Sequence, residues 1–225
     1  MKVGVLALQG DVPEHLRALA ESAPDATLVP VRAPADLERT DALFLPGGES
    51  TTIARLLHET RLWEPLGIRL RRGLPVLATC AGLILIAKTL APSPGGTDPP
   101  TLGVLDVVVR RNDYGPQRES FEGPVRVEGL SGPPFPGVFI RSPRILGVGQ
   151  DAAPIAWRDH EVVGVRSGRM WGLAFHPELS GDLRLHRHFL RSATQRDPGR
   201  SSRSRDTVPP QAPPGLRPRG TPRAR

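Results

Sequence analysis

Hydrophobic positions in the first ninety residues follow two alternating patterns. Short runs rich in Val, Leu and Ala, bounded by Gly, Pro or Asp, are typical of strands buried on both faces, and they occur at residues 2–8, 28–31, 42–45 and 75–79. Apolar stripes between them predict helices that begin near residue 11 and cover residues 51–59, 62–71 and 81–90. This alternation predicts an α/β fold with a doubly wound, mostly parallel sheet flanked by helices.

The start of the first expected helix carries a capping pattern. Asp11 with Glu14 three residues later is typical of an N-cap pair. Pro13 suits the first turn, where its missing N–H has no helical partner, and Leu16 and Leu19 continue the apolar stripe. We therefore expect Asp11 to cap this helix.

The pattern changes after residue 90. Residues 91–100 are rich in Pro and Gly and predict a surface loop. Six strand-like segments follow, several of them joined closely enough for hairpins, at residues 104–110, 125–127, 138–140, 154–158, 161–166 and 170–174. A helix over residues 182–193 is expected to close the fold. The sequence therefore predicts antiparallel strands added to the parallel sheet.

The positive charge of the chain is concentrated at its C-terminal end. The net charge is +7, but residues 196–225 hold eight arginines and two aspartates, which leaves 22 basic and 21 acidic side chains in residues 1–195. The same segment has seven prolines and no aromatic residue, so it buries too little apolar surface to offset the entropy of ordering. We expect one domain at residues 1–195 and a disordered tail at 196–225. We prefer a solvated extension to the alternative, a tail that binds nucleic acid or an acidic partner.

Cysteine usage and hydropathy indicate the compartment. A single cysteine cannot form an intramolecular disulfide. The apolar run at residues 3–8 is too short for a signal peptide, and no stretch approaches the roughly 18 apolar residues of a membrane span. We expect a soluble, cytoplasmic protein.

Cys80 stands between an apolar strand-like run and an apolar helix-like run. A strand that turns sharply into a helix can present a nucleophile at the top of a parallel sheet, where the helix N-terminus stabilises a thiolate. Ala81 and Gly82 let the backbone pass close to the thiol, whereas Ala78 stands where such turns usually carry a second glycine. The pattern indicates a catalytic cysteine, and a small buried apolar residue is the alternative.

His176-Pro177-Glu178 follows an expected strand directly. In an extended chain, residues two apart project to the same side, so His176 and Glu178 can approach each other. A carboxylate there fixes the tautomer of the imidazole and favours its protonated form, as a base serving a thiol requires. A surface turn is the alternative for this tripeptide alone, and its combination with Cys80 favours catalysis.

Five other histidines have no comparable carboxylate pattern, and no zinc-type spacing is present: His15, His58, His160, His186 and His188. His186 and His188 lie two residues apart on the last expected helix, where side chains at that spacing do not meet. We expect these two to be surface or packing residues.

Paired glycines at Gly47-Gly48 end another expected strand. Such glycines can turn backbone N–H groups toward a carbonyl or an oxyanion. The alternative is a simple turn in which Ser50 caps the next helix. The segment lacks the GxxxxGK[ST] arrangement of a P-loop.

Several motifs occur in the order seen in one protein family. They are Val5-Leu6-Ala7-Leu8-Gln9-Gly10-Asp11, Leu45-Pro46-Gly47-Gly48-Glu49-Ser50-Thr51-Thr52, Thr79-Cys80-Ala81-Gly82-Leu83-Ile84, Arg111-Asn112, Ser120-Phe121-Glu122, Phe139-Ile140-Arg141 and Phe175-His176-Pro177-Glu178-Leu179. Over about residues 1–193 the chain resembles the glutaminase subunits of two-component pyridoxal 5'-phosphate synthases. These are triad-type class I glutamine amidotransferases with a flavodoxin-like fold.

The resemblance implies a role for each matching residue. It implies Cys80 as nucleophile, His176 as general base and then acid, and Glu178 as the residue that orients His176. The positions that hold L-glutamine in the family are matched by Gly48, Glu49, Ser50, Arg111, Ile140 and Arg141. The oxyanion hole would be formed by backbone N–H groups near Gly48 and Ala81.

The resemblance also implies a partner. The Gln9-Gly10 loop matches one that meets the synthase subunit, which would receive ammonia within a large hetero-oligomer. No metal or organic cofactor is expected at the glutaminase site.

Three positions depart from the family pattern: Ala78, Pro116 and Ser142. Ala78 could strain the turn at Cys80, and Pro116 removes a charge where arginine is common. A glutaminase serving another synthase is the closest rival, and a catalytically silent binding module on the same fold is another. The Gln9-Gly10-Asp11 and Ser120-Phe121-Glu122 matches oppose the first, and retention of Cys80, His176 and Glu178 opposes the second.

Overall fold

The computed structural model describes residues 1–93, 98–113 and 120–194. The expected tail at 196–225 and the departure at Pro116 lie outside these residues. Among the described residues, no helix combines the length and the apolar character needed to cross a membrane.

A nine-stranded sheet forms the centre of the molecule, with the strand order β2-β1-β3-β4-β12-β11-β10-β7-β8. Its first half is parallel: β2 (Thr27–Val31), β1 (Lys2–Leu6), β3 (Ala42–Leu45), β4 (Val76–Thr79) and β12 (Met170–Leu173). All residues of β3 and β4 are buried, as the short apolar runs predicted.

The second half of the sheet is antiparallel and extends from β12. It comprises β11 (Glu161–Ser167), β10 (Ala153–Arg158), β7 (Phe121–Val127) and β8 (Phe135–Phe139). The expected fold class, a doubly wound parallel sheet with added antiparallel strands, is therefore confirmed.

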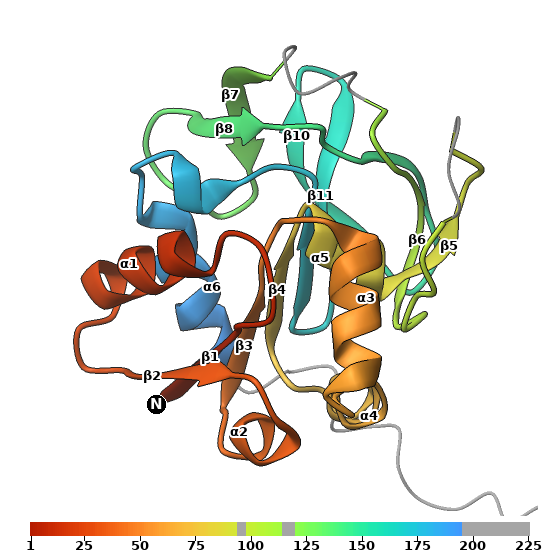
Figure 1. Cartoon of the computed structure of the whole chain (residues 1–225). Helices are drawn as coiled ribbons and strands as arrows, with labels where there is room; N and C mark the ends of the chain where they lie inside the picture. The colour runs from red at the N-terminus through yellow and green to blue at the C-terminus, as the bar shows by residue number, and fades with distance from the viewer. Residues whose placement is uncertain (94–97, 114–119, 195–225) are drawn as a thin grey trace, which may run out of the picture.

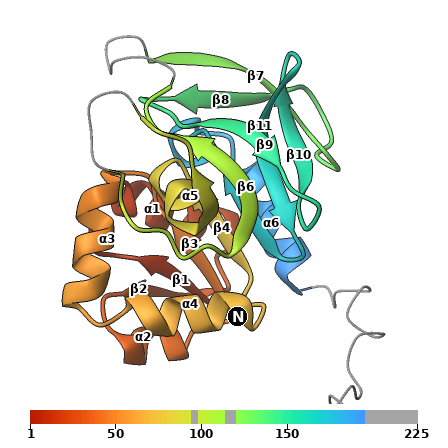
Figure 2. The ribbon, with the colours of Figure 1, turned by 90° about the vertical axis from the view of Figure 1, so that its right-hand side faces the viewer.

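Helices cover both faces of the parallel strands (Figures 1 and 2). On one face lie α1 (Val12–Ser22) and α6 (Arg184–Thr194), which contact each other. On the other lie α3 (Ser50–Glu59), α4 (Trp63–Arg71) and α5 (Ala81–Ile86), with α3 against α5 and α4. A short helix that was not expected, α2 (Pro34–Glu38), contacts β2 and α4.

The helix expected over residues 81–90 is wrong in its second half. The chain leaves the helix after Ile86, and β5 (Ala87–Leu90) pairs in parallel with β6 (Leu105–Arg110). A strand that was not expected, β9 (Arg144–Val148), completes this three-stranded sheet. Ala87–Leu90 has the sequence AKTL, with Lys88 and Thr89 exposed, and so short a segment can continue a helix or form a strand, so its pairing with β6 decides the outcome.

The carboxyl ends of the parallel strands converge at one edge of the sheet. β1 leads to the Gln9–Asp11 loop, β3 to Gly47-Gly48, β4 to Cys80 and β12 to His176. In open α/β sheets, ligands bind in the crevice outside this edge. The topology thus brings the Gln9–Asp11, Gly47-Gly48, Cys80 and His176 segments into one region.

Candidate active site

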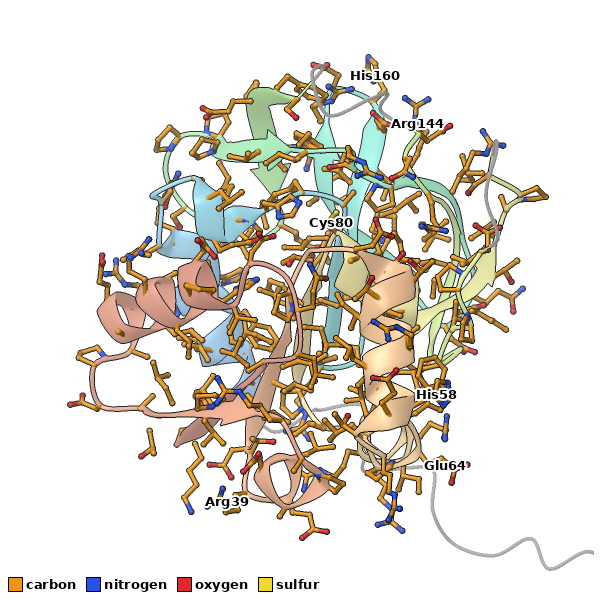
Figure 3. The ribbon with its side chains drawn as sticks, viewed as in Figure 1. Arg39, His58, Glu64, Cys80, Arg144 and His160 are labelled. Carbon is orange, nitrogen blue, oxygen red and sulfur yellow. The ribbon has the colours of Figure 1, made fainter. Side chains whose placement is uncertain are left out.

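Cys80 occupies a sharp turn between β4 and α5 and lies near the centre of the molecule (Figure 3). Its φ of 48° and ψ of −103° are strained for a residue other than glycine. Gly82 makes the turn possible, because a Cβ at that position would lie 2.3 Å from the carbonyl oxygen of Leu45. Ala78 is an ordinary member of β4, paired with both Leu45 and Gly172, so the unusual backbone conformation lies at Cys80 and not at Ala78.

The Cys80 thiol faces into the candidate site. Its Sγ lies 4.0 Å from the carbonyl oxygen of Ile140, and its backbone N–H donates to the carbonyl of Leu173 at 2.8 Å. The side chain stands at the start of α5, where the helix dipole stabilises negative charge.

His176 and Glu178 meet, but not in the extended conformation expected. His176 is followed by a 3₁₀ turn over Pro177–Leu179, which Pro177 can begin because its φ is compatible with a helical turn. The turn brings Nδ1 of His176 within 2.7 Å of Oε1 of Glu178. A backbone hydrogen bond of 2.8 Å from His176 to Val138 anchors the turn to β8.

Burial and neighbouring groups act in opposite directions on His176. Burial works to lower the pKa of this imidazole, but interactions with Asp11, Cys80 and Glu178 raise its pKa well above the usual value. Nε2 of His176 has no complete hydrogen bond to any described residue, although interaction with Cys80 is among the causes of the raised pKa of His176. Protonated His176 beside Cys80 is therefore the favoured state.

Asp11 is a site residue that the sequence reasoning missed. Asp11 stands at the N-cap position of α1 but makes no capping hydrogen bond with its side chain, so the expected capping pair is wrong. Instead, its Oδ2 lies 3.2 Å from Nδ1 of His176. Gly47 leaves room for this contact, because a Cβ there would lie 2.8 Å from both atoms.

His15 is a second missed residue. It is fully buried on α1, with Nε2 3.2 Å from Oγ1 of Thr79 and 3.4 Å from Oε2 of Glu178. Proximity in the sequence pairs Glu178 with His176. The contact between Glu178 and His15 joins residues 163 positions apart, so no local sequence pattern indicates it. The pKa of His15 is lowered, and burial is the largest cause.

The remaining histidines make other contacts. His186 is fully buried and packs against His15 and Phe44. His188 donates from Nε2 to the carbonyl oxygen of Glu128 at 3.1 Å and packs against the Trp171 ring. His58 stacks on Trp63, and His160 is exposed.

A cavity of about 240 Å³ opens beside the thiol. All six residues expected to hold the substrate line it, together with Cys80 and His176: Gly48, Glu49, Ser50, Arg111, Ile140 and Arg141. Asp11, Ile84 and Asn112 also line it. Two other expected residues, Glu178 and Ala81, are buried and do not line the cavity.

Charged groups of both signs face the cavity. Glu49 lies 3.2 Å from Arg111 and 3.8 Å from Arg141, and Arg111 also lies 3.7 Å from Asp98. An amino acid carries one carboxylate and one ammonium, and guanidinium and carboxylate groups match them respectively.

The Gly47-Gly48 segment is not a simple turn capped by Ser50. Ser50 is the first residue of α3, and the N-cap is Glu49. Gly48 has a φ of +145°, which favours glycine. The Glu49 N–H donates to Oε1 of Gln9 at 2.8 Å, so the Gln9 loop is tied directly to the segment expected to supply the oxyanion hole.

Two further observations bear on the expected site. Ser142, one of the departures from the family pattern, is fully buried, and its hydroxyl has no hydrogen-bond partner among the described residues.

Asp11, His176 and Glu178 offer donor atoms within 4.8 Å of one another and could hold a cation. The 2.7 Å contact between His176 and Glu178 uses two of those donors as a hydrogen-bonded pair.

Comparison with known proteins gives concordant results. The model of the SNO glutamine amidotransferase family matches residues 5–195. The pyridoxal 5'-phosphate synthase subunit PdxT of Streptomyces coelicolor is 50% identical over 187 residues, covering 83% of this chain and 91% of the relative. PdxT of Thermococcus onnurineus is 48% identical over 198 residues, covering 86% and 99%. A solved structure described as a glutamine amidotransferase is 44% identical, with a TM-score of 0.76, covering 85% of this chain and 98% of that one.

Proposed function

The chain belongs to the SNO glutamine amidotransferase family, and on that premise we propose that Cys80, His176 and Glu178 form the triad with which it hydrolyses glutamine. The observation that carries the proposal is the strained Cys80 turn beside a buried His176–Glu178 pair joined at 2.7 Å. A nucleophile, a base and a residue that orients the base are the parts that covalent acyl transfer requires. We further propose residues 1–195 as the glutaminase domain.

The reaction begins with attack of the Cys80 thiolate on the side-chain carboxamide carbon of glutamine. The carbonyl oxygen takes up the electron pair, and N–H groups near Gly48 and Ala81 stabilise it. Protonated His176 gives its proton to the departing nitrogen, and ammonia leaves a glutamyl thioester. Water then attacks the thioester and returns a proton to His176, which releases glutamate and restores the thiolate.

Charges in the cavity orient the amino-acid end of the substrate. Arg111 and Arg141 suit the α-carboxylate, and Glu49 suits the α-ammonium. Glu49 also faces Arg111 at 3.2 Å and Arg141 at 3.8 Å. Substrate entry would exchange this internal pairing for pairing with glutamine.

The chain serves pyridoxal 5'-phosphate synthesis as a glutaminase subunit, and its partner is the synthase subunit. We propose that ammonia passes to that partner within a large hetero-oligomer, and that the Gln9-Gly10 loop lies at the contact between them. Gln9 accepts the Glu49 N–H at 2.8 Å, so docking at this loop would reach the oxyanion segment directly. Partner binding would then stabilise the active arrangement of Gly47-Gly48.

The test is a glutaminase assay of the full chain with and without its synthase subunit. Cys80→Ser and His176→Ala should each lower kcat on the order of a thousandfold or more, because triad members act as a unit. His160→Ala, which changes an exposed histidine, is the matched control and should leave kcat unchanged. Near-normal hydrolysis by Cys80→Ser would refute the mechanism.

The partner's effect is tested in the same assay. The synthase subunit should raise the rate of glutamine hydrolysis markedly, and ammonium salts should replace this chain as nitrogen source for the synthase. Equal rates with and without the synthase subunit would refute gating by the partner. Failure of the synthase subunit to bind would refute the proposed contact.

A further inference from the structure

His15 is a buried polar side chain that the triad does not account for. It projects from α1, is fully buried, and has Phe44 and His186 as ring neighbours at 5.6 and 5.8 Å between centroids. A buried imidazole loses its hydration and needs polar partners to compensate. Its Nε2 has two such neighbours, and both belong to the segments that carry the proposed triad.

The hydroxyl of Thr79 determines which nitrogen of His15 carries the proton. Oγ1 of Thr79 lies 3.5 Å from the carbonyl oxygen of Leu45, which can only accept a hydrogen bond. The hydroxyl therefore directs its hydrogen to that carbonyl and accepts at 3.2 Å from Nε2 of His15. We therefore assign the hydrogen of neutral His15 to Nε2, where the Thr79 hydroxyl and Oε2 of Glu178 are the acceptors within reach.

Glu178 has one oxygen that its partner in the triad does not use. Oε1 faces Nδ1 of His176 at 2.7 Å, while Oε2 has no complete hydrogen bond among the residues the structure describes. Nε2 of His15 lies 3.4 Å from Oε2. The His15 N–H therefore lies between the Thr79 hydroxyl and the second oxygen of the buried carboxylate, where its dipole stabilises negative charge.

We propose that His15 is a positioning residue of the glutaminase reaction, which links Thr79, the neighbour of the nucleophile, to the second oxygen of Glu178. This inference rests on the proposed roles of Cys80, His176 and Glu178. By holding the carboxylate ionised and aligned, His15 keeps the imidazolium of His176 stable beside the thiolate. Loss of the His15 N–H should therefore act on the Cys80–His176 pair and not on substrate binding.

The chain supplies a matched control for this role. His186 is as fully buried as His15 and packs against the same Phe44 ring, but neither of its nitrogens has a hydrogen-bond partner among the described residues. Burial lowers the pKa of His186 to about 3, so it stays neutral. Replacing either histidine with Phe keeps an aromatic ring, and only His15→Phe removes an N–H directed at Glu178.

The experiment compares His15→Phe, His15→Gln and His186→Phe in the full chain, with melting temperature measured for each. In the complex with the synthase subunit, His15→Phe should lower kcat on the order of tenfold with little change in the KM for glutamine, as loss of a supporting contact typically does. His15→Gln keeps an N–H donor near the same place and should recover part of the loss. His186→Phe should leave kcat unchanged.

A second readout needs no glutaminase turnover. Cys80 is the only cysteine, so the pH dependence of alkylation by iodoacetamide reports its thiolate in the isolated chain. The titratable groups that face His176 are Asp11, Glu178 and Cys80. Those that face Glu178 are His15 and His176. In His15→Phe the imidazolium of His176 should be less stable and should support the Cys80 thiolate less. The midpoint of alkylation should therefore move to higher pH, whereas His186→Phe should keep the original midpoint.

The outcomes separate this inference from the proposed function. If His15→Phe folds, hydrolyses glutamine at the original rate and keeps the alkylation midpoint, the positioning role is wrong, even while Cys80→Ser stays inactive. Additive losses from His15→Phe and Glu178→Gln would also overturn it, because residues that act through one carboxylate must couple. Near-normal activity of Cys80→Ser would instead overturn the proposed function itself.

Discussion

A methyl group added at Gly47 is expected to displace the general base while leaving the fold in place. The Cβ of Gly47→Ala would lie 2.3 Å from Cε1 of His176 and 2.8 Å from its Nδ1. Ordinary contacts at such an atom begin near 3.4 Å, so the imidazole must retreat by roughly 1 Å. Gly47 does not have a positive φ, so alanine meets a steric conflict and not backbone strain.

The size of the effect follows from that displacement. A shift of about 1 Å in a catalytic group can cost on the order of a hundredfold in rate, or about 2.7 kcal/mol of barrier. The overlap should also lower the free energy of unfolding by about 1 to 3 kcal/mol, as overpacking does. We expect kcat to fall accordingly with a smaller change in KM, because His176 acts mainly in the transition state.

The assay is ammonia release by the complex with the synthase subunit, together with the melting temperature. Gly147→Ala is the control, since its nearest neighbour would be Val108 at an ordinary 3.7 Å. Adding Gly47→Ala to His176→Ala should cost little more, because the displaced base is already gone. A folded Gly47→Ala protein with kcat within about twofold of the original would refute this reasoning.

Three further outcomes are expected. Asp11→Asn removes a group that raises the pKa of His176, so the imidazolium should deprotonate earlier and the alkaline limb of kcat/KM should move to lower pH; an unchanged limb would contradict this. Gly82→Ala places a Cβ 2.3 Å from the carbonyl oxygen of Leu45, and calorimetry should show a lower melting temperature by several degrees, since overpacking costs about 1 to 3 kcal/mol. Ending the chain at Thr194 should leave melting temperature and activity unchanged, because the segment beyond it has almost no apolar content. A large fall in either quantity would show that the removed segment contributes to the fold.

Local patterns were sufficient for most elements of the parallel half. Runs at β1, β3 and β4 are short, apolar and bounded by breakers, and each forms a buried strand. The helix expected over 81–90 failed because its last four residues pair with β6. Strand β9 was not predicted because its own sequence has only a weak strand pattern, and its pairing partner β6 lies elsewhere in the chain.

The residues of the candidate site also divide into those that local sequence patterns indicated and those that they did not. Cys80 and Gly48 could be singled out because special residue types mark turns where strands end, and His176-Glu178 because the pair is close in sequence. The resemblance to a family supplied Arg111, Ile140 and Arg141, which no local pattern singled out. All of these lie in or directly behind one cavity.

The sequence by itself determined which short segments turn sharply and which side chains are chemically able to act, because backbone preference and side-chain chemistry are local properties. Only the tertiary structure decided which other residues those side chains contact. Asp11 carries a capping pattern and yet faces His176 at 3.2 Å. His15, on α1, contacts Glu178 at 3.4 Å although the two residues lie at opposite ends of the described chain. Such contacts arise because parallel strands bring their carboxyl ends to one edge, and a distance in space between residues so far apart along the chain leaves no periodic trace in the sequence.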